Sequence, residues 1–205
     1  PPADSDGDFQ LNVTATSTDG DDSESVTGSI NVSVDADADA PILKVEDASG
    51  TEDQPIELDI ASGLTDLDGS ESLSITISDV PDGASLSAGT DNGDGTWTLE
   101  AGDLDGLTVT PPADSDGDFQ LNVTATSTDG DDSESVTGSI NVSVDADADA
   151  PILKVEDASG TEDQPIELDI ASGLTDLDGS ESLSITISDV PDGASLSAGT
   201  DNGDG

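Results

Sequence analysis

The chain has 205 residues, and its 49 acidic residues outnumber its two lysines so strongly that the formal net charge is −47 at pH 7. With only Lys44 and Lys154 to neutralise phosphates, the composition excludes nucleic acid as a partner and argues against an anionic membrane surface. No apolar run is long enough for direct membrane insertion. The sequence has no cysteine and no histidine, so zinc, copper and iron lack their usual ligands and hard cations remain.

The dominant feature of the sequence is a long internal repeat. Residues 1–95 recur without a change as residues 111–205, a period of 111 − 1 = 110 residues, and only residues 96–110 occur once. Units of about 100 residues are typical of immunoglobulin-like and cadherin-like domains, whereas helical solenoid repeats are shorter, at about 20–47 residues. The period therefore predicts a tandem array of domains.

The phase of the repeat predicts three parts. We expect residues 1–38 to be the C-terminal part of one repeat, residues 39–148 a complete repeat, and residues 149–205 the N-terminal part of the next. Neither terminal part holds enough strands to bury a core of its own. We therefore expect each to be completed by further chain or by a neighbouring molecule.

The complete repeat contains short segments in which apolar and polar residues alternate, which is the pattern of half-buried strands. Ile56, Leu58 and Ile60, for example, alternate with acidic residues. Residues 91–95 are a predicted hairpin turn, because their Asn-Gly pair accepts positive φ. No segment shows helical periodicity. The predicted strands are residues 42–46, 55–61, 72–79, 84–88, 96–100, 107–110, 118–126 and 135–144.

This succession of strands and turns rich in glycine, proline and aspartate predicts an all-β fold. We expect tandem immunoglobulin-like antiparallel β-sandwich domains, with about seven strands each, joined end to end. The core would be aliphatic, with Trp97 and Phe119 as its aromatic members. Repulsion among the acidic residues opposes compaction, so we expect the metal-free domain to be only marginally stable.

Two copies of an acidic linker separate the repeats. Asp145, Asp147 and Asp149 alternate with alanines before Pro151, and Asp35, Asp37 and Asp39 do the same before Pro41. An extended chain presents alternate side chains on one side, so each linker offers a row of carboxylates. Ca²⁺ takes six to eight oxygen ligands, of which carboxylates are the most common. We interpret the linker as a hinge that becomes rigid when calcium binds; the alternative is a solvated acidic spacer.

The strand order predicts which other carboxylates meet the linkers. In repeats joined end to end, antiparallel strands place the loops 47–54 and 111–117 at the C-terminal end of the domain and the loops 62–71 and 127–134 at its N-terminal end. So many acids without basic partners would repel one another, and several Ca²⁺ per junction would relieve this. The candidate metal ligands are Asp35, Asp37, Asp39, Glu52, Asp66, Asp68, Asp114, Asp116, Asp118, Asp145, Asp147, Asp149, Asp176 and Asp178, with Asp53, Glu71 and Glu181 beside them.

The motifs resemble two groups of calcium-dependent adhesion repeats. The alternating aspartates before Ala-Pro in residues 144–151 resemble the calcium-binding linker of cadherins. Residues 51–56, 66–73 and 107–112 resemble the immunoglobulin-like and cadherin-like extender repeats of giant bacterial RTX adhesins, some of which bind ice. The resemblance implies a calcium-rigidified stalk at the bacterial cell surface. Such a stalk projects ligand-binding domains for attachment and biofilm formation, and its partners are neighbouring identical repeats of the same chain.

Three other functions compete with this one. A ligand-binding adhesive module would need a concave site with exposed aromatic residues, which the sequence does not offer. A salt-adapted acidic spacer without specific calcium sites remains open. An enzyme is not expected, because histidine, cysteine and arginine are absent and paired carboxylates would still need a substrate cleft.

Overall fold

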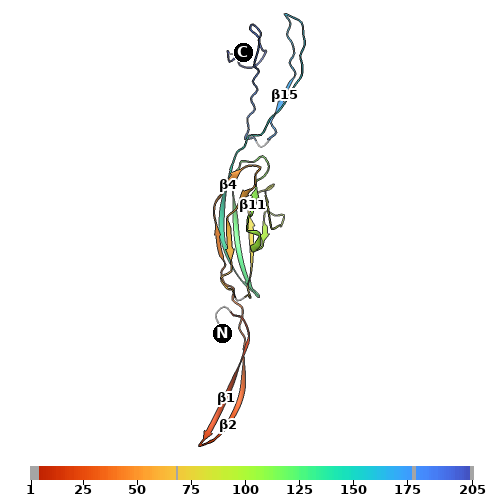
Figure 1. The fold of residues 1–205 in the computed structure, drawn as a ribbon. Helices are drawn as coiled ribbons and strands as arrows, with labels where there is room; N and C mark the ends of the chain where they lie inside the picture. Colours follow the sequence, from red (N-terminus) through yellow and green to blue (C-terminus); the bar gives the residue numbers. More distant parts are fainter. Residues whose placement is uncertain (1–4, 68, 177–178, 204–205) are drawn as a thin grey trace. The chain divides into compact units, whose positions relative to one another are not determined.

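The computed structural model describes residues 5–67, 69–176 and 179–203, and in these the regular structure is almost entirely β-strand (Figure 1). The chain divides into two compact units, Pro1–Asp147 and Ala148–Gly205. The first unit holds a two-stranded hairpin followed by the complete repeat. The predicted all-β fold class is thus confirmed.

The complete repeat is built from a large sheet and two small ones. The large sheet has the strand order β4-β13-β12-β7-β10-β9, and the small sheets have the orders β5-β11-β8 and β3-β6. All of these strand pairs are antiparallel except β4 with β13. The elements are β3 (Ile42–Val45), β4 (Ala48–Thr51), β5 (Ile56–Glu57), β6 (Ile60–Gly63), β7 (Ser72–Ser78), β8 (Ser85–Leu86), β9 (Thr90–Asp91), β10 (Trp97–Leu99), the 3-10 turn η1 (Ala101–Asp103), β11 (Thr108–Thr110), β12 (Phe119–Asp129) and β13 (Asp132–Asp145).

One hydrophobic core joins the large sheet to the small ones, as in a β-sandwich. Ile77 and Val123 of the large sheet are 0% exposed, and so is Val109 of β11 in a small sheet. Ile56 and Leu58, whose alternation predicted an inward face, are each 2% exposed. The side chains predicted to face inward do form the core, with Trp97 and Phe119 partly buried against it.

Two predicted boundaries were wrong. The segment 55–61 is not one strand, because its hydrogen-bond partner changes: the Leu58 amide donates to the Leu107 carbonyl (2.9 Å), and the Glu46 amide to the Asp59 carbonyl (3.2 Å). The loop 127–134 is largely strand, since β12 and β13 continue to a two-residue turn that begins with Gly130 at φ +58°.

A further strand, β4, lies inside the predicted loop 47–54. It runs parallel to β13, with Val142 opposite Ala48 and Asp145 opposite Thr51. Its Ala-Ser-Gly-Thr sequence has no strand pattern, so the partner strand creates it. Gly50 is required here, because a Cβ would lie 2.6 Å from Cγ1 of the buried Ile56.

The hairpin β1 (Phe9–Asp19) and β2 (Asp22–Val32) has the sequence and register of β12 and β13. However, β13 continues to Asp145, beyond the residue that corresponds to the end of β2, because its last residues pair with β4. In the second unit, β14 (Ile152–Val155) pairs with β15 (Ile170–Gly173), as β3 pairs with β6. Residues 182–188, which copy β7, form no strand. Identical sequences therefore adopt different structures according to the strands available beside them.

Candidate metal centres

Three carboxylates gather at the N-terminal end of the complete repeat. Oxygen atoms of Asp39, Asp66 and Glu71 all lie within 4.8 Å of one another. Asp39 is the last aspartate of the acidic linker, Asp66 follows β6, and Glu71 immediately precedes β7. Asp66 and Glu71 are buried, at 6% and 9% exposure. Such a group could hold a metal ion, and it joins the linker to the loop between β6 and β7.

Glu71 has the most demanding environment of the three. Its Oε1 atom accepts a hydrogen bond from the Asp39 amide at 2.6 Å. Its Oε2 atom is buried, and no residue in the described part of the chain offers it a hydrogen bond. A buried carboxylate oxygen without a donor is costly, because its desolvation is uncompensated. A cation at this position would compensate it.

Hydrogen bonds hold the linker against this end of the domain. The Ala38 amide donates to Oδ2 of Asp132 at 3.0 Å, and the Thr65 hydroxyl donates to the Ala40 carbonyl at 3.0 Å. Ala38 is 6% exposed. Alternate linker residues thus pack inward while Asp35, Asp37 and Asp39 remain exposed.

The second unit repeats the same backbone arrangement. The Asp149 amide donates to Oε1 of Glu181 at 2.5 Å, and Oε2 of Glu181 is buried without a partner among the described residues. Asp176 is 3% exposed, and its Oδ2 accepts from the Ser180 hydroxyl at 3.1 Å. The described residues of this unit form only the strands β14 and β15, so the arrangement is a local property of the sequence.

Glu52 organises the C-terminal end of the complete repeat. It is 3% exposed, and its Oε1 accepts a hydrogen bond from the Asp147 amide at 2.7 Å. The Glu52 amide in turn donates to the Asp145 carbonyl at 3.0 Å. Its Oε2, like those of Glu71 and Glu181, is a buried carboxylate oxygen with no hydrogen-bond donor in the described residues. Glu52 and Glu71 thus play equivalent parts at opposite ends, each accepting from a linker amide and keeping one oxygen available.

Asp53 and Asp114 lie together beside Glu52. The Asp114 amide donates to Oδ1 of Asp53 at 3.0 Å, and the two residues have φ of 58° and 55°. A left-handed conformation is unfavourable for a residue other than glycine, although aspartate tolerates it better than most.

Asp118 has a structural role that the sequence did not indicate. Its Oδ1 accepts hydrogen bonds from the Ser143 hydroxyl at 3.1 Å and the Val144 amide at 2.9 Å. Asp8 makes the same two contacts in the hairpin, both at 3.0 Å. These bonds fix the end of the strand that leads into each linker, so one Asp118 oxygen is already engaged.

The remaining candidates are distributed as follows. Asp116 is half-buried in the loop between β11 and β12, and Asp145 and Asp147 are exposed. Asp68 and Asp178 lie outside the described residues. The two glutamates with an available oxygen at the N-terminal ends, Glu71 and Glu181, were named only beside the main candidates. Their position directly before the Ser-Leu-Ser-Ile strand pattern was the available signal.

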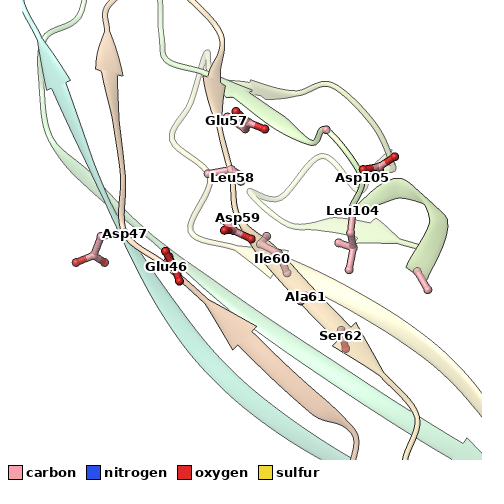
Figure 2. A pocket seen from close by; sticks show the side chains of 12 residues that line it. Glu46, Asp47, Glu57, Leu58, Asp59, Ile60, Ala61, Ser62, Leu104 and Asp105 are labelled. Atoms are coloured by element: carbon pink, nitrogen blue, oxygen red, sulfur yellow. The ribbon is translucent and has the colours of Figure 1, made fainter.

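A broad acidic hollow of about 640 Å³ lies elsewhere on the complete repeat (Figure 2). Glu46, Glu57, Asp59 and Asp105 contribute carboxylates to it, alongside apolar side chains such as Leu104. The four acids are exposed. Asp47 also lines the hollow, and its Oδ1 accepts hydrogen bonds from the backbone amide and the side-chain amide of Asn141 in β13. Exposed acids of this kind are solvated, and they do not form a compact ligand group.

No known protein family and no curated protein matches this sequence. Among solved structures, the chain is similar to a variant of an endo-fucoidan hydrolase from glycoside hydrolase family 107, with 15% sequence identity and a TM-score of 0.29. The match covers 85% of this chain and 30% of that structure, so this chain spans less than a third of the hydrolase. A similarity this weak carries no argument. Across the residues that the structure describes, no helix is long and apolar enough to cross a membrane.

Proposed function

We propose that this chain is part of a calcium-rigidified structural extender, a stalk that separates the functional domains of a large bacterial surface adhesin from the cell. The observation that carries the proposal is the buried Glu71. Its Oε1 accepts a hydrogen bond from the Asp39 amide of the linker. Its Oε2 receives no hydrogen bond from the described residues, and Glu71 belongs to a group of three carboxylates. A cation at this position would connect the linker to the body of the domain.

Calcium is the ion that the ligand chemistry favours. The group offers only carboxylate oxygens, and the sequence contains neither histidine nor cysteine. Hard cations prefer such ligands. Ca²⁺ accepts six to eight oxygens in flexible geometry, whereas Mg²⁺ demands a strict octahedron and retains several waters. Closely spaced carboxylates, one exposed on the linker and two buried on the loop between β6 and β7, suit the larger and more tolerant ion.

The mechanism is a shift of the linker between flexible and fixed states. Without an ion, the carboxylates of the linker and the domain repel one another, and the chain has almost no basic residues to offset this. An ion that binds only the closed arrangement stabilises it by mass action. Glu52 and Glu71 accept hydrogen bonds from linker amides at the two ends of the domain, and these contacts define the closed arrangement that a bound ion would stabilise.

The dimensions and repetition suit a spacer. Strand β12 has 11 residues, which at about 3.3 Å per residue gives the domain a length of about 36 Å. Each further repeat would add a similar length plus a linker. The resemblance of residues 51–56 and 66–73 to adhesin extender repeats supports a place at the bacterial cell surface, with neighbouring repeats as partners.

Thermal unfolding in CaCl₂ and in MgCl₂, at the same ionic strength, tests the proposal. We expect millimolar Ca²⁺ to raise the melting temperature of the complete repeat well above its value in EDTA, and Mg²⁺ to have little effect. Equal effects of the two ions would mean that they act by screening alone. The acids would then be a solvation adaptation, and the extender would lack specific calcium sites.

A further inference from the structure

The turn between β9 and β10 contains an Asn-Gly pair, Asn92 and Gly93, and both residues are held by hydrogen bonds. The side-chain nitrogen Nδ2 of Asn92 donates to the hydroxyls of Thr96 at 3.0 Å and Thr98 at 3.1 Å. The Asn92 backbone amide donates to the Thr96 carbonyl at 3.0 Å. The Gly93 amide donates to Oδ1 of Asp91 at 2.8 Å. The structure therefore restrains the side chain of the asparagine and the backbone nitrogen that follows it.

An Asn-Gly pair is chemically reactive, because asparagine is thermolabile and glycine has no side chain to hinder attack by its own nitrogen. The Gly93 nitrogen attacks Cγ of Asn92, so that an N–Cγ bond forms and the Cγ–Nδ2 bond breaks with release of ammonia. Water then opens the resulting succinimide ring to aspartate or isoaspartate at position 92. The sum of the two steps is hydrolysis of one side-chain amide, without oxidation or reduction. Both residues are exposed, so water has access to the ring.

Both reacting groups are tethered in the folded turn. The nitrogen that would attack donates its hydrogen to a carboxylate, and the nitrogen that would leave donates to two hydroxyls. The Thr96 hydroxyl is itself held in place, because it donates to Oδ1 of Asp94 at 2.6 Å. Ring closure must carry Cγ of Asn92 onto the Gly93 nitrogen. A tethered side chain cannot make this movement without breaking its bonds to Thr96 and Thr98.

We propose that Asn92 is a deamidation site that the folded turn keeps unreactive, with Thr96 and Thr98 as the residues that position its side chain. The reaction proceeds only when the hairpin of β9 and β10 opens. This hairpin lies at one edge of the large sheet, and β9 has only two residues, so it opens more readily than the central strands. The reaction needs the chain and water but no metal ion, so it does not depend on the calcium proposal.

Deamidation would disrupt the hairpin in which it occurs. It replaces the donor nitrogen by a carboxylate oxygen, which cannot donate to the two hydroxyls. The new charge lies beside Asp91 and Asp94, whose carboxylates repel it. Isoaspartate also inserts one carbon into the backbone, so the register that places Trp97 opposite Asp91 is lost. Trp97 is partly buried against the core and is the only tryptophan of the chain, so its fluorescence reports the change.

Mass spectrometry of the incubated chain tests the proposal. The full chain is held at physiological temperature and mildly alkaline pH, either folded or in urea, and is then cleaved at glutamate. Cleavage after Glu71 and Glu100 releases residues 72–100, in which Asn92 is the only asparagine. We expect deamidation to be about tenfold or more slower in the folded chain, because two side-chain hydrogen bonds must break before ring closure. Equal rates in the folded chain and in urea would overturn the inference.

Matched substitutions in the hairpin assign the protection to one hydroxyl. Thr98→Val removes an acceptor of Asn92 and should speed deamidation of the folded chain by about two- to tenfold, with no change in urea. Thr90→Val makes the same change on the residue opposite Thr98 and should leave the rate unchanged. Thr98→Ser keeps a hydroxyl and should restore most of the protection. Equal acceleration by the two valine variants, or none by either, would contradict the assigned role of Thr98.

A substitution that reproduces one product tests the consequence of the reaction. Asn92→Asp should shift the fluorescence of Trp97 to longer wavelength and lower the melting temperature of the repeat, because the hairpin loses two hydrogen bonds and gains a charge. The released peptide of this variant should show no mass change on incubation, which confirms that Asn92 is the reacting residue. Fluorescence and melting identical to those of the wild-type chain would refute the claim that deamidation disrupts the hairpin.

Discussion

Replacing Glu71 by glutamine is predicted to stabilise the metal-free repeat. The carboxylate oxygens of Asp39, Asp66 and Glu71 lie within 4.8 Å of one another, so with an effective dielectric constant of about 80 each pair repels by at least about 0.9 kcal/mol. Glu71 takes part in two of the three pairs, which gives about 1.7 kcal/mol in total. Asp66 is close to Glu71 in the unfolded chain as well, so about 1 kcal/mol of this is specific to the folded state.

Calcium should reverse the sign of this effect. A carboxylate about 2.4 Å from Ca²⁺ attracts it by about 3 kcal/mol even at the dielectric constant of water, and glutamine loses that attraction. This corresponds to roughly a hundredfold weaker calcium binding. Glutamine keeps Oε1 as an acceptor for the Asp39 amide, so the backbone contact is preserved.

The assay is thermal unfolding of the wild-type and Glu71→Gln chains in EDTA and in CaCl₂. About 1 kcal/mol corresponds to a rise in melting temperature of about 4–8 °C for a domain of this size class, so the variant should melt several degrees higher in EDTA and lower in CaCl₂. Glu134→Gln removes one charge from an exposed position on β13 and should change neither value appreciably. If Glu71→Gln lowered the melting temperature equally in both conditions, the carboxylate would be a structural acceptor and not a metal ligand.

Three further predictions concern other parts of the complete repeat. Gly50→Ala should destabilise the repeat by about 1–3 kcal/mol, because the new Cβ would lie 2.6 Å from the buried Ile56. Chemical denaturation measures this loss, and an unchanged free energy of unfolding would mean that β4 shifts freely. The side-chain hydrogen bond from Thr96 lowers the pKa of Asp94, so Thr96→Val should raise it towards its usual value in an NMR titration. That contact stabilises the fold above the usual aspartate pKa and is lost as pH falls through the lowered value. Glu52→Ala should accelerate hydrogen exchange at the Asp147 amide, which donates a hydrogen bond to Glu52. Unchanged protection of that amide would refute the role of Glu52 in holding the linker.

The core of this domain was predictable because its residues follow the period of an extended chain. Ile75, Ile77, Leu121 and Val123 alternate with serine, threonine or asparagine, and all four are fully buried. The strand β4 was not predictable, because an Ala-Ser-Gly-Thr segment carries no alternation. This segment is a strand because it pairs with β13, whose partner residues lie more than ninety positions further along the chain (142 − 48 = 94).

The sequence predicted only part of the candidate site, for a related reason. Alternation with alanine identifies the linker aspartates, and the linker packs its alanines inward at Ala38. Glu71 accepts a hydrogen bond from a linker amide 32 residues earlier in the chain, and its position directly before the strand pattern of β7 is the only local signal of that contact. The engagement of Asp118 with Val144 likewise depends on tertiary register. Local pattern identifies ligand type, whereas three-dimensional contacts determine which ligands converge.

The central claim is that calcium fixes the linkers, and small-angle X-ray scattering tests it most directly. In EDTA and in MgCl₂ at matched ionic strength, we predict a broad distribution of interatomic distances from a chain with mobile linkers. In CaCl₂ we predict a longer and narrower distribution from a rod. Indistinguishable profiles in CaCl₂ and MgCl₂ would contradict the account, because the carboxylates would then respond to ionic strength and not to a bound ion.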